Sequence, residues 1–145
     1  MADEKRIVLT TFGSYGDLHP YVAVGLALKE MGHRPVVATS DVYREKVEET
    51  GLAFHPVRPD LPPIDDPRAA EMIAKVMDTS PGAGVEYLVK DLLMSDLRGS
   101  YEDLLAVTEG ADFLLSHPIT FAGPLVAEKT GIRWFSSVLA PVSFF

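Results

Sequence analysis

The sequence contains no cysteine among its 145 residues. This absence excludes disulfide bonds, thiolate metal ligands and a cysteine nucleophile, and it is typical of proteins that work in a reducing compartment. Basic residues are few as well, since 13 lysines and arginines stand against 21 aspartates and glutamates and give a net charge of −8. Affinity for nucleic acids and for anionic membranes comes mainly from lysine and arginine, so the composition argues against both partners.

Long apolar runs are also absent. No stretch reaches the ~20 apolar residues that a membrane-spanning helix needs. The polar segment Met1–Arg6 precedes the first apolar run, and it lacks the apolar core of a signal peptide. The apolar fraction of 47% is nevertheless ordinary for a globular protein. We therefore expect one compact cytoplasmic domain.

Strand-like and helix-like patterns alternate along the chain, which predicts a parallel sheet with crossover helices. The first strands are nearly continuous apolar runs, as in sheets that are covered on both faces. We therefore expect an α/β fold, a Rossmann-like parallel sheet with helices on both faces. The predicted strands are 6–11, 35–39, 52–57, 112–116 and 132–139, and the predicted helices are 18–31, 41–49, 68–78, 84–108 and 122–130, with a kink or break at Gly99-Ser100 and a proline-rich loop at 58–67.

The most informative segment is the turn Gly13–Asp17, between the first predicted strand and the first predicted helix. Glycine lets the backbone pass close to a ligand, and the N–H groups at a helix N-terminus attract anions. The turn matches neither common nucleotide fingerprint, because the third glycine of Gly-x-Gly-x-x-Gly is missing and no lysine lies between Lys5 and Lys29. From these residues alone, an ordinary tight turn explains the pattern as well as an anion site does.

Three residues could carry acid–base chemistry. Asp17 could act as a base or could simply cap the helix. His19 lies two positions further along, on nearly the opposite side of a regular helix, so we expect it to pack beside Pro20 instead of pairing with Asp17. His117 follows the fourth predicted strand, at the edge where doubly wound sheets bind ligands, and its loop could face Asp17, although a plain loop histidine is the simpler interpretation.

The spacing of the histidines indicates no metal site. The chain has four of them, and no aspartate or glutamate stands at ligand spacing beside one. We expect neither a metal nor another cofactor.

Several stretches form a more specific combination when they are taken together. They are Gly13–Tyr21 (Gly-Ser-Tyr-Gly-Asp-Leu-His-Pro-Tyr), Gly25–Leu28, Met31–Val36, 41–57 and 111–141. This combination resembles the N-terminal domain of GT-B glycosyltransferases of the family 1 type. The similarity is clearest to sterol glucosyltransferases, to the rhamnosyltransferase of rhamnolipid synthesis, and to antibiotic glycosyltransferases of the vancomycin and macrolide type. The middle of the chain, 59–108, matches no motif and corresponds to the variable acceptor-facing region of that family.

The resemblance implies an inverting, metal-independent enzyme that transfers a hexose from a UDP- or TDP-sugar to a hydroxyl of a small lipophilic or natural-product acceptor. Many members carry a histidine as base in a Gly-His-x-x-Pro motif. The aligned residues here are Gly16-Asp17-Leu18-His19-Pro20, which implies that Asp17 is the base, with His19 and His117 as further candidates. The same resemblance would place Gly13, Ser14, Tyr15 and Gly16 near the diphosphate of the donor.

The variable middle would face the acceptor. The candidate acceptor contacts are Met72, Met77, Tyr87, Met94 and Thr120. Methionine-rich surfaces adapt to irregular ligands, and a lipophilic acceptor is compatible with peripheral membrane contact. Each of these residues could equally be an ordinary core residue.

GT-B enzymes have two Rossmann-like domains, and the resemblance covers only the first. We therefore expect residues 1–145 to be a partial N-terminal acceptor-binding domain that lacks the C-terminal donor-binding domain and is inactive alone. Two alternatives stay open. One is a non-catalytic split subunit or isolated folding domain. The other is a different α/β nucleotide-binding enzyme, such as a reductase, which the missing third glycine disfavours.

Overall fold

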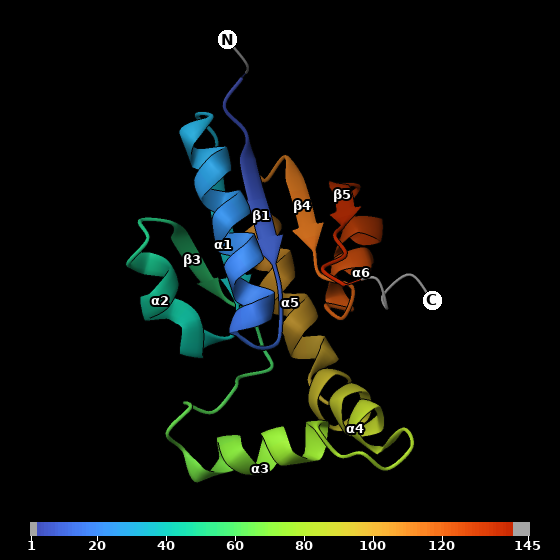
Figure 1. Ribbon diagram of the computed structural model, residues 1–145. Coiled ribbons are helices and arrows are strands. Elements are labelled where there is room, and N and C mark those ends of the chain that lie inside the picture. Colours follow the sequence, from blue (N-terminus) through green and yellow to red (C-terminus); the bar gives the residue numbers. More distant parts are fainter. Residues whose placement is uncertain (1–2, 141–145) are drawn as a thin grey trace.

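The computed structural model describes residues 3–140, and these form a five-stranded parallel sheet (Figure 1). The strands are β1 (Arg6–Thr10), β2 (Arg34–Thr39), β3 (Ala53–Pro56), β4 (Phe113–Ser116) and β5 (Arg133–Ser136). Their order across the sheet is β3-β2-β1-β4-β5, with every neighbouring pair parallel. The order reverses direction at β1, which makes the sheet doubly wound. The predicted α/β parallel sheet is confirmed.

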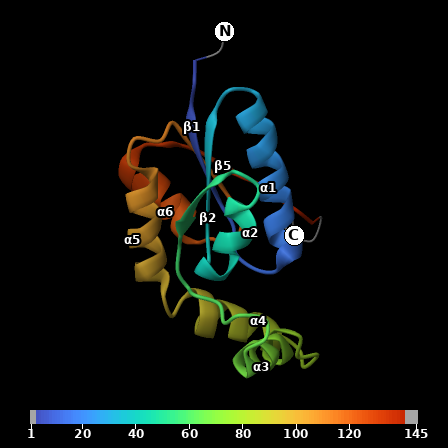
Figure 2. The same cartoon turned by 90° about the vertical axis from the view of Figure 1, so that its left-hand side faces the viewer.

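Helices cover both faces of this sheet, as predicted. In Figure 2, α1 (Tyr15–Glu30) and α2 (Arg44–Glu48) lie on one face, and α5 (Leu97–Thr108) and α6 (Ala122–Thr130) lie on the other. No helix within 3–140 combines the length and the apolar character needed to span a bilayer.

The core is divided between the two faces. Val8 packs with Leu104 under α5, whereas its neighbour Leu9 packs with Leu18 under α1. Successive side chains of a strand point to opposite faces, so a central strand needs apolar residues at every position. All four of these side chains are buried, which explains the continuous apolar run of β1.

Helix α1 begins three residues earlier than predicted. Its N-cap is Ser14, whose hydroxyl accepts the N–H of Gly16, and the carboxylate of Asp17 accepts the N–H of Ser14 in return. The two side chains form a capping box, in which an aspartate takes the place of the more usual glutamate or glutamine. Asp17 therefore does help to cap the helix, but as its third residue and not as the N-cap, which was the predicted position.

The predicted helix 84–108 is also divided differently. The chain forms α4 (Ala83–Glu86), a π-helical segment η2 (Tyr87–Leu93) and a turn before α5. Gly99 and Ser100 lie inside α5, so the predicted kink there is wrong. The Ser100 hydroxyl donates to the carbonyl of Arg58, and a Cβ at Gly99 would lie within 2.8 Å of the Arg58 guanidinium. The small residues allow a close approach instead of ending the helix.

Residues 59–96, which we call the arm, extend beyond the carboxyl edge of the sheet (Figure 1). The arm contains α3 (Pro67–Val76), α4 and η2, and these three elements contact mainly one another. The chain leaves the sheet at Arg58 and returns at Leu97. The arm is therefore attached to the rest of the molecule chiefly at its two ends.

An ion pair holds the start of the arm against α5, the helix that follows the arm. The carboxylate of Asp103 accepts hydrogen bonds from the backbone N–H of Arg58 at 3.0 Å and from its Nε and Nη2 atoms at 2.8 Å each. The guanidinium holds the pKa of Asp103 below its usual value, which shows that the charged pair is the favoured state. This bidentate pair fixes where the chain enters the arm, because it holds Arg58 against α5.

We expect Asp103→Asn to lower the free energy of unfolding by about 1 kcal/mol, because one charged acceptor of the bidentate pair is lost while Arg58 stays partly solvated. Glu102→Gln is the matched control. Its carboxylate lies 3.8 Å from the same guanidinium on a more exposed side chain, so its effect should stay below about 0.5 kcal/mol. Urea unfolding of both variants measures the difference, and equal effects would contradict the assignment.

Candidate functional site

The site lies where the carboxyl ends of β1 and β4 meet. Thr10 is paired with Ser116 in the sheet, and the N–H of His117 continues the ladder by donating to the carbonyl of Thr10 at 3.0 Å. The turn after β1 carries Asp17. Together these constraints bring Nε2 of His117 to 3.6 Å from Oδ1 of Asp17. The predicted approach of the two loops is confirmed, and the role of His117 stays a prediction.

The two oxygens of the Asp17 carboxylate have different surroundings. Oδ2 accepts the N–H of Ser14 at 2.8 Å and lies 3.0 Å from its hydroxyl. Oδ1 faces His117. The side chain is partly exposed. One oxygen is therefore anchored to the turn, and the other is directed at His117.

The hydrogen bonds of His117 determine its tautomer. Nδ1 accepts the N–H of Ile119 at 3.3 Å, so the proton of the neutral ring is on Nε2, which is directed at Asp17. The loop is fixed further by Thr120, whose hydroxyl and N–H both donate to the carbonyl of His117. Burial lowers the pKa of His117, and the nearby Asp17 opposes this only in part. The imidazole is therefore neutral at neutral pH.

Tyr21 forms the wall behind this pair. Its ring centroid lies 6.3 Å from that of His117, and its hydroxyl shares a short hydrogen bond with Ser137. Burial raises the pKa of Tyr21 to about 12, so the phenol stays protonated. The proximity of Tyr21 and Ser137 to the pair was not predicted, because a tyrosine in an apolar helix and a serine at the end of a strand carry no local signal of it.

The turn already has an anion at the helix N-terminus. The N–H of Ser14 donates to Oδ2 of Asp17, and the N–H of Gly16 donates to Oγ of Ser14. The N–H of Asp17 donates to the carbonyl of Ser14. A diphosphate approaching Gly13–Gly16 would meet the carboxylate of Asp17 and not a row of free donors. The contact of Gly13, Ser14, Tyr15 and Gly16 with a donor diphosphate stays a prediction.

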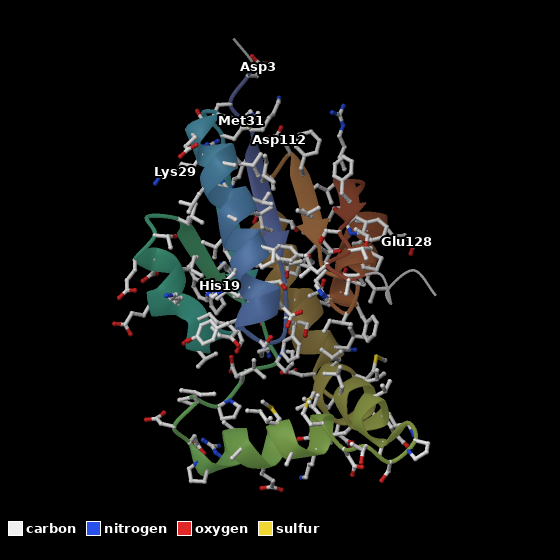
Figure 3. The ribbon with its side chains drawn as sticks, viewed as in Figure 1. Asp3, His19, Lys29, Met31, Asp112 and Glu128 are labelled. Atoms are coloured by element: carbon white, nitrogen blue, oxygen red, sulfur yellow. The ribbon has the colours of Figure 1, made fainter. Side chains whose placement is uncertain are left out.

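His19 is not part of this pair. Its exposed ring stacks on Tyr15 at a centroid distance of 5.5 Å, and Tyr15 in turn contacts Tyr43. Figure 3 shows His19 on the side of α1 that faces α2. The expected separation of His19 from Asp17 is confirmed, but the expected partly buried position beside Pro20 is wrong.

The predicted acceptor contacts separate into two groups. Thr120 lies on the His117 loop and borders a cavity of about 20 Å³, which Leu93 of the arm and Leu97 of α5 also line. The others lie on the arm: Met77 and Met94 are exposed, Met72 and Tyr87 are half-buried, and Lys75 covers the ring of Tyr87. Thr120 is thus brought beside the Asp17–His117 pair, whereas the arm residues are not.

A second, larger cavity lies at the opposite edge of the sheet. It has a volume of about 940 Å³ and is an open groove between the ends of α5 and α6, lined by Lys5, Glu109, Asp112 and Arg133 among others. Figure 3 shows Asp112 at this amino edge, far from His19. Ligands of doubly wound sheets bind at the carboxyl edge, so Asp17 and His117, and not this groove, form the candidate site. Within 3–140, no three histidine, aspartate or glutamate side chains converge as a metal site requires.

Comparison with known proteins gives a consistent result. Residues 7–91 match the glycosyltransferase family 28 N-terminal domain. The chain is 29% identical to a sterol 3-beta-glucosyltransferase of Neurospora crassa over 144 residues, and 32% identical to the UDP-sugar-dependent glycosyltransferase 52 of Dictyostelium discoideum over 145 residues. The fold is similar to that of the Streptomyces sp. SF2575 glycosyltransferase SsfS6 complexed with thymidine diphosphate, with a TM-score of 0.69 and 25% identity.

These similarities extend over nearly all of this chain but over only part of each relative. The alignments cover 97% and 94% of the chain against 9% and 8% of the Neurospora and Dictyostelium proteins. For SsfS6 the shares are 92% of this chain and 38% of that one.

The lowered pKa of His117 makes stability depend on pH. The unfolded chain binds the proton more readily than the folded state, so the free energy of unfolding should rise with pH just below 6.5 and level off above it. His117 contributes at most about 1.4 kcal/mol per pH unit. Burial also lowers the pKa of His55, which adds a second contribution of the same sign.

Urea unfolding between pH 5 and 8 measures this dependence. His117→Gln should reduce the slope below pH 6.5, and the double variant with His55→Gln should reduce it further. If the free energy of unfolding of His117→Gln changed with pH as steeply as that of the wild type, His117 would not be a source of the pH dependence.

Proposed function

The chain belongs to the glycosyltransferase family 28 N-terminal domain family, and on this premise we propose that it is the acceptor-side domain of an inverting hexosyltransferase. The enzyme would transfer a hexose from a nucleotide diphosphate sugar to a hydroxyl of a small lipophilic acceptor. The observation that carries the proposal is the 3.6 Å approach of Asp17 Oδ1 to His117 Nε2 at the switch point of the sheet.

Asp17 acts as the general base. The acceptor hydroxyl donates a hydrogen bond to Oδ1. The oxygen of that hydroxyl attacks the anomeric carbon of the sugar on the side opposite the nucleotide diphosphate, which is the leaving group. The new C–O bond forms as the bond to the nucleotide diphosphate breaks, and the hydroxyl proton passes to Asp17. A single displacement of this kind inverts the anomeric configuration. Asp17 suits the role because its second oxygen is anchored by Ser14.

His117 serves as a donor and not as the base. Its Nε2 carries the proton in the neutral tautomer, and its Nδ1 is occupied by the N–H of Ile119. The ring can therefore donate to Oδ1 of Asp17 or to the acceptor oxygen that lies between them. Either contact orients the oxygen for attack, so His117 is expected to help catalysis without accepting the proton itself.

A second, donor-binding domain would supply the activated sugar. Two facts support this part of the proposal: the related SsfS6 was crystallised with thymidine diphosphate, and the chain spans only 38% of that protein. Ser14 and Tyr15 would then lie at the boundary with the donor diphosphate. This chain spans only 9% and 8% of the length of the Neurospora and Dictyostelium relatives, which is equally compatible with a non-catalytic split subunit that needs a partner chain.

The acceptor is proposed to be apolar. Curated relatives are sterol 3-beta-glucosyltransferases, and the arm exposes Met77 and Met94 beyond the carboxyl edge. Met72, Tyr87 and Thr120 are the further proposed contacts. If such an acceptor is drawn from a bilayer, the enzyme would make peripheral membrane contact.

In the full-length protein, Asp17→Asn should lower kcat for sugar transfer by about 10²–10⁴-fold, because the amide cannot accept the hydroxyl proton. His117→Gln should cost about tenfold. Asp112→Asn, at the amino edge of the sheet, is the matched control and should retain activity. A coupled assay for released nucleotide diphosphate measures all three, with Tm recorded to show that each variant is folded. Full activity of Asp17→Asn would refute the proposal.

Residues 1–145 alone should show no transfer from UDP- or TDP-sugars to hydrophobic acceptors, since the proposed donor-binding domain is needed to present the sugar. The full-length protein is the positive control in the same assay. Turnover by the isolated chain would contradict the two-domain proposal, and it would leave the role of Asp17 to be decided by its own variant.

A further inference from the structure

Tyr43 makes a contact with the site that nothing in the local sequence signals. It ends the short helix η1 (Asp41–Tyr43), between β2 and α2. Its hydroxyl donates a hydrogen bond of 2.6 Å to the carbonyl oxygen of Gly13, 30 residues earlier in the chain. Tyr43 thus reaches the catalytic turn from a different part of the fold.

The Gly13 carbonyl and the Ser14 N–H belong to one peptide group. The Tyr43 hydroxyl donates to the oxygen of this group, and the Ser14 N–H of the same group donates to Oδ2 of Asp17 at 2.8 Å. Because a peptide group is planar, a bond that fixes its carbonyl also fixes the direction of its N–H. A hydrogen bond at the carbonyl also polarises the group and strengthens donation by the N–H.

The backbone of Gly13 lies directly against the same carboxylate. Gly13 has a φ of +131°, and a Cβ at this position would lie 2.3 Å from Oδ2 of Asp17. The place of the carboxylate therefore depends on where the Gly13–Ser14 peptide lies. A rotation of that peptide would move or release Oδ2, and Oδ1 would turn with it.

We propose that Tyr43 is a positioning residue for Asp17, which acts through the Gly13–Ser14 peptide and keeps Oδ1 directed at His117 and the acceptor hydroxyl. This inference rests on the proposed function of Asp17 as the base. Tyr43 itself touches neither member of the pair through an observed hydrogen bond; its effect passes through one peptide group.

The Tyr43 hydroxyl is well suited to this task. Its ring packs against Tyr15 at a centroid distance of 5.4 Å, which limits the positions that the side chain can take. Burial raises the pKa of Tyr43, so the hydroxyl keeps its proton and stays a donor over the working pH range. Replacing Tyr43 with Phe would remove the hydrogen bond and leave the ring contact in place.

The test is a double-mutant cycle in the full-length protein. Tyr43→Phe should lower kcat about fivefold, the cost of one hydrogen bond, and leave KM for donor and acceptor unchanged. In the Asp17→Asn background the same substitution should change kcat by less than about 1.5-fold, because the group that it positions is already disabled. Tyr101→Phe, on the opposite face of the sheet, is the matched control and should leave kcat unchanged.

Two results would overturn the inference. Unchanged kcat in Tyr43→Phe, together with a large loss in Asp17→Asn, would reject Tyr43 while the proposed function stands. An equal loss of kcat on adding Tyr43→Phe to the wild type and to Asp17→Asn would show that Tyr43 has a general structural role. Activity retained by Asp17→Asn would instead reject the proposed function itself.

A second measurement does not depend on turnover. Hydrogen exchange of the Ser14 amide, followed by NMR, should be faster in Tyr43→Phe than in the wild type, because its bond to Asp17 is less well held. Unchanged exchange at Ser14 would reject the relay through the peptide group.

Discussion

The site depends on the pairing of β1 with β4. The register of these strands places Thr10 opposite Ser116, and the next ladder bond fixes the backbone of His117 against the end of β1. Two side chains about 100 residues apart in the chain are thereby held 3.6 Å apart. A slip of one residue would turn His117 to the other face of the sheet and shift it by about 3.3 Å, so no local change could restore the pair.

Much of this arrangement follows from local patterns. The apolar runs of the strands and the alternation of elements predicted the parallel sheet, and the glycine turn with Asp17 indicated the candidate site. His117 was recognisable only as a histidine at a strand end, because its pairing with Asp17 depends on which strands are neighbours. Ser14 illustrates a signal that was present but not used, since a serine followed three residues later by an acid is a capping pattern.

The remaining differences between the predictions and the structure come from contacts between distant parts of the chain. Gly99 and Ser100 suggested a helix break, but they allow Arg58 to approach, and Ser100 and Arg58 are 42 residues apart. Tyr43 and Gly13 are separated by 30 residues. The periodicity of a sequence shows which face of a helix or strand is apolar. It does not show which side chain will contact which backbone group in a distant segment. Such contacts appear only when the elements are packed.

The electrostatics of the first turn bear on how the two proposed domains divide the work. The N-terminus of α1 favours one negative group, and the carboxylate of Asp17 already takes that position through the N–H of Ser14. A donor diphosphate beside it would be repelled, and the chain as a whole carries a net charge of −8. Groups outside this turn would have to neutralise the diphosphate. This supports the proposal that a second domain binds the nucleotide and leaves the first turn to hold the base.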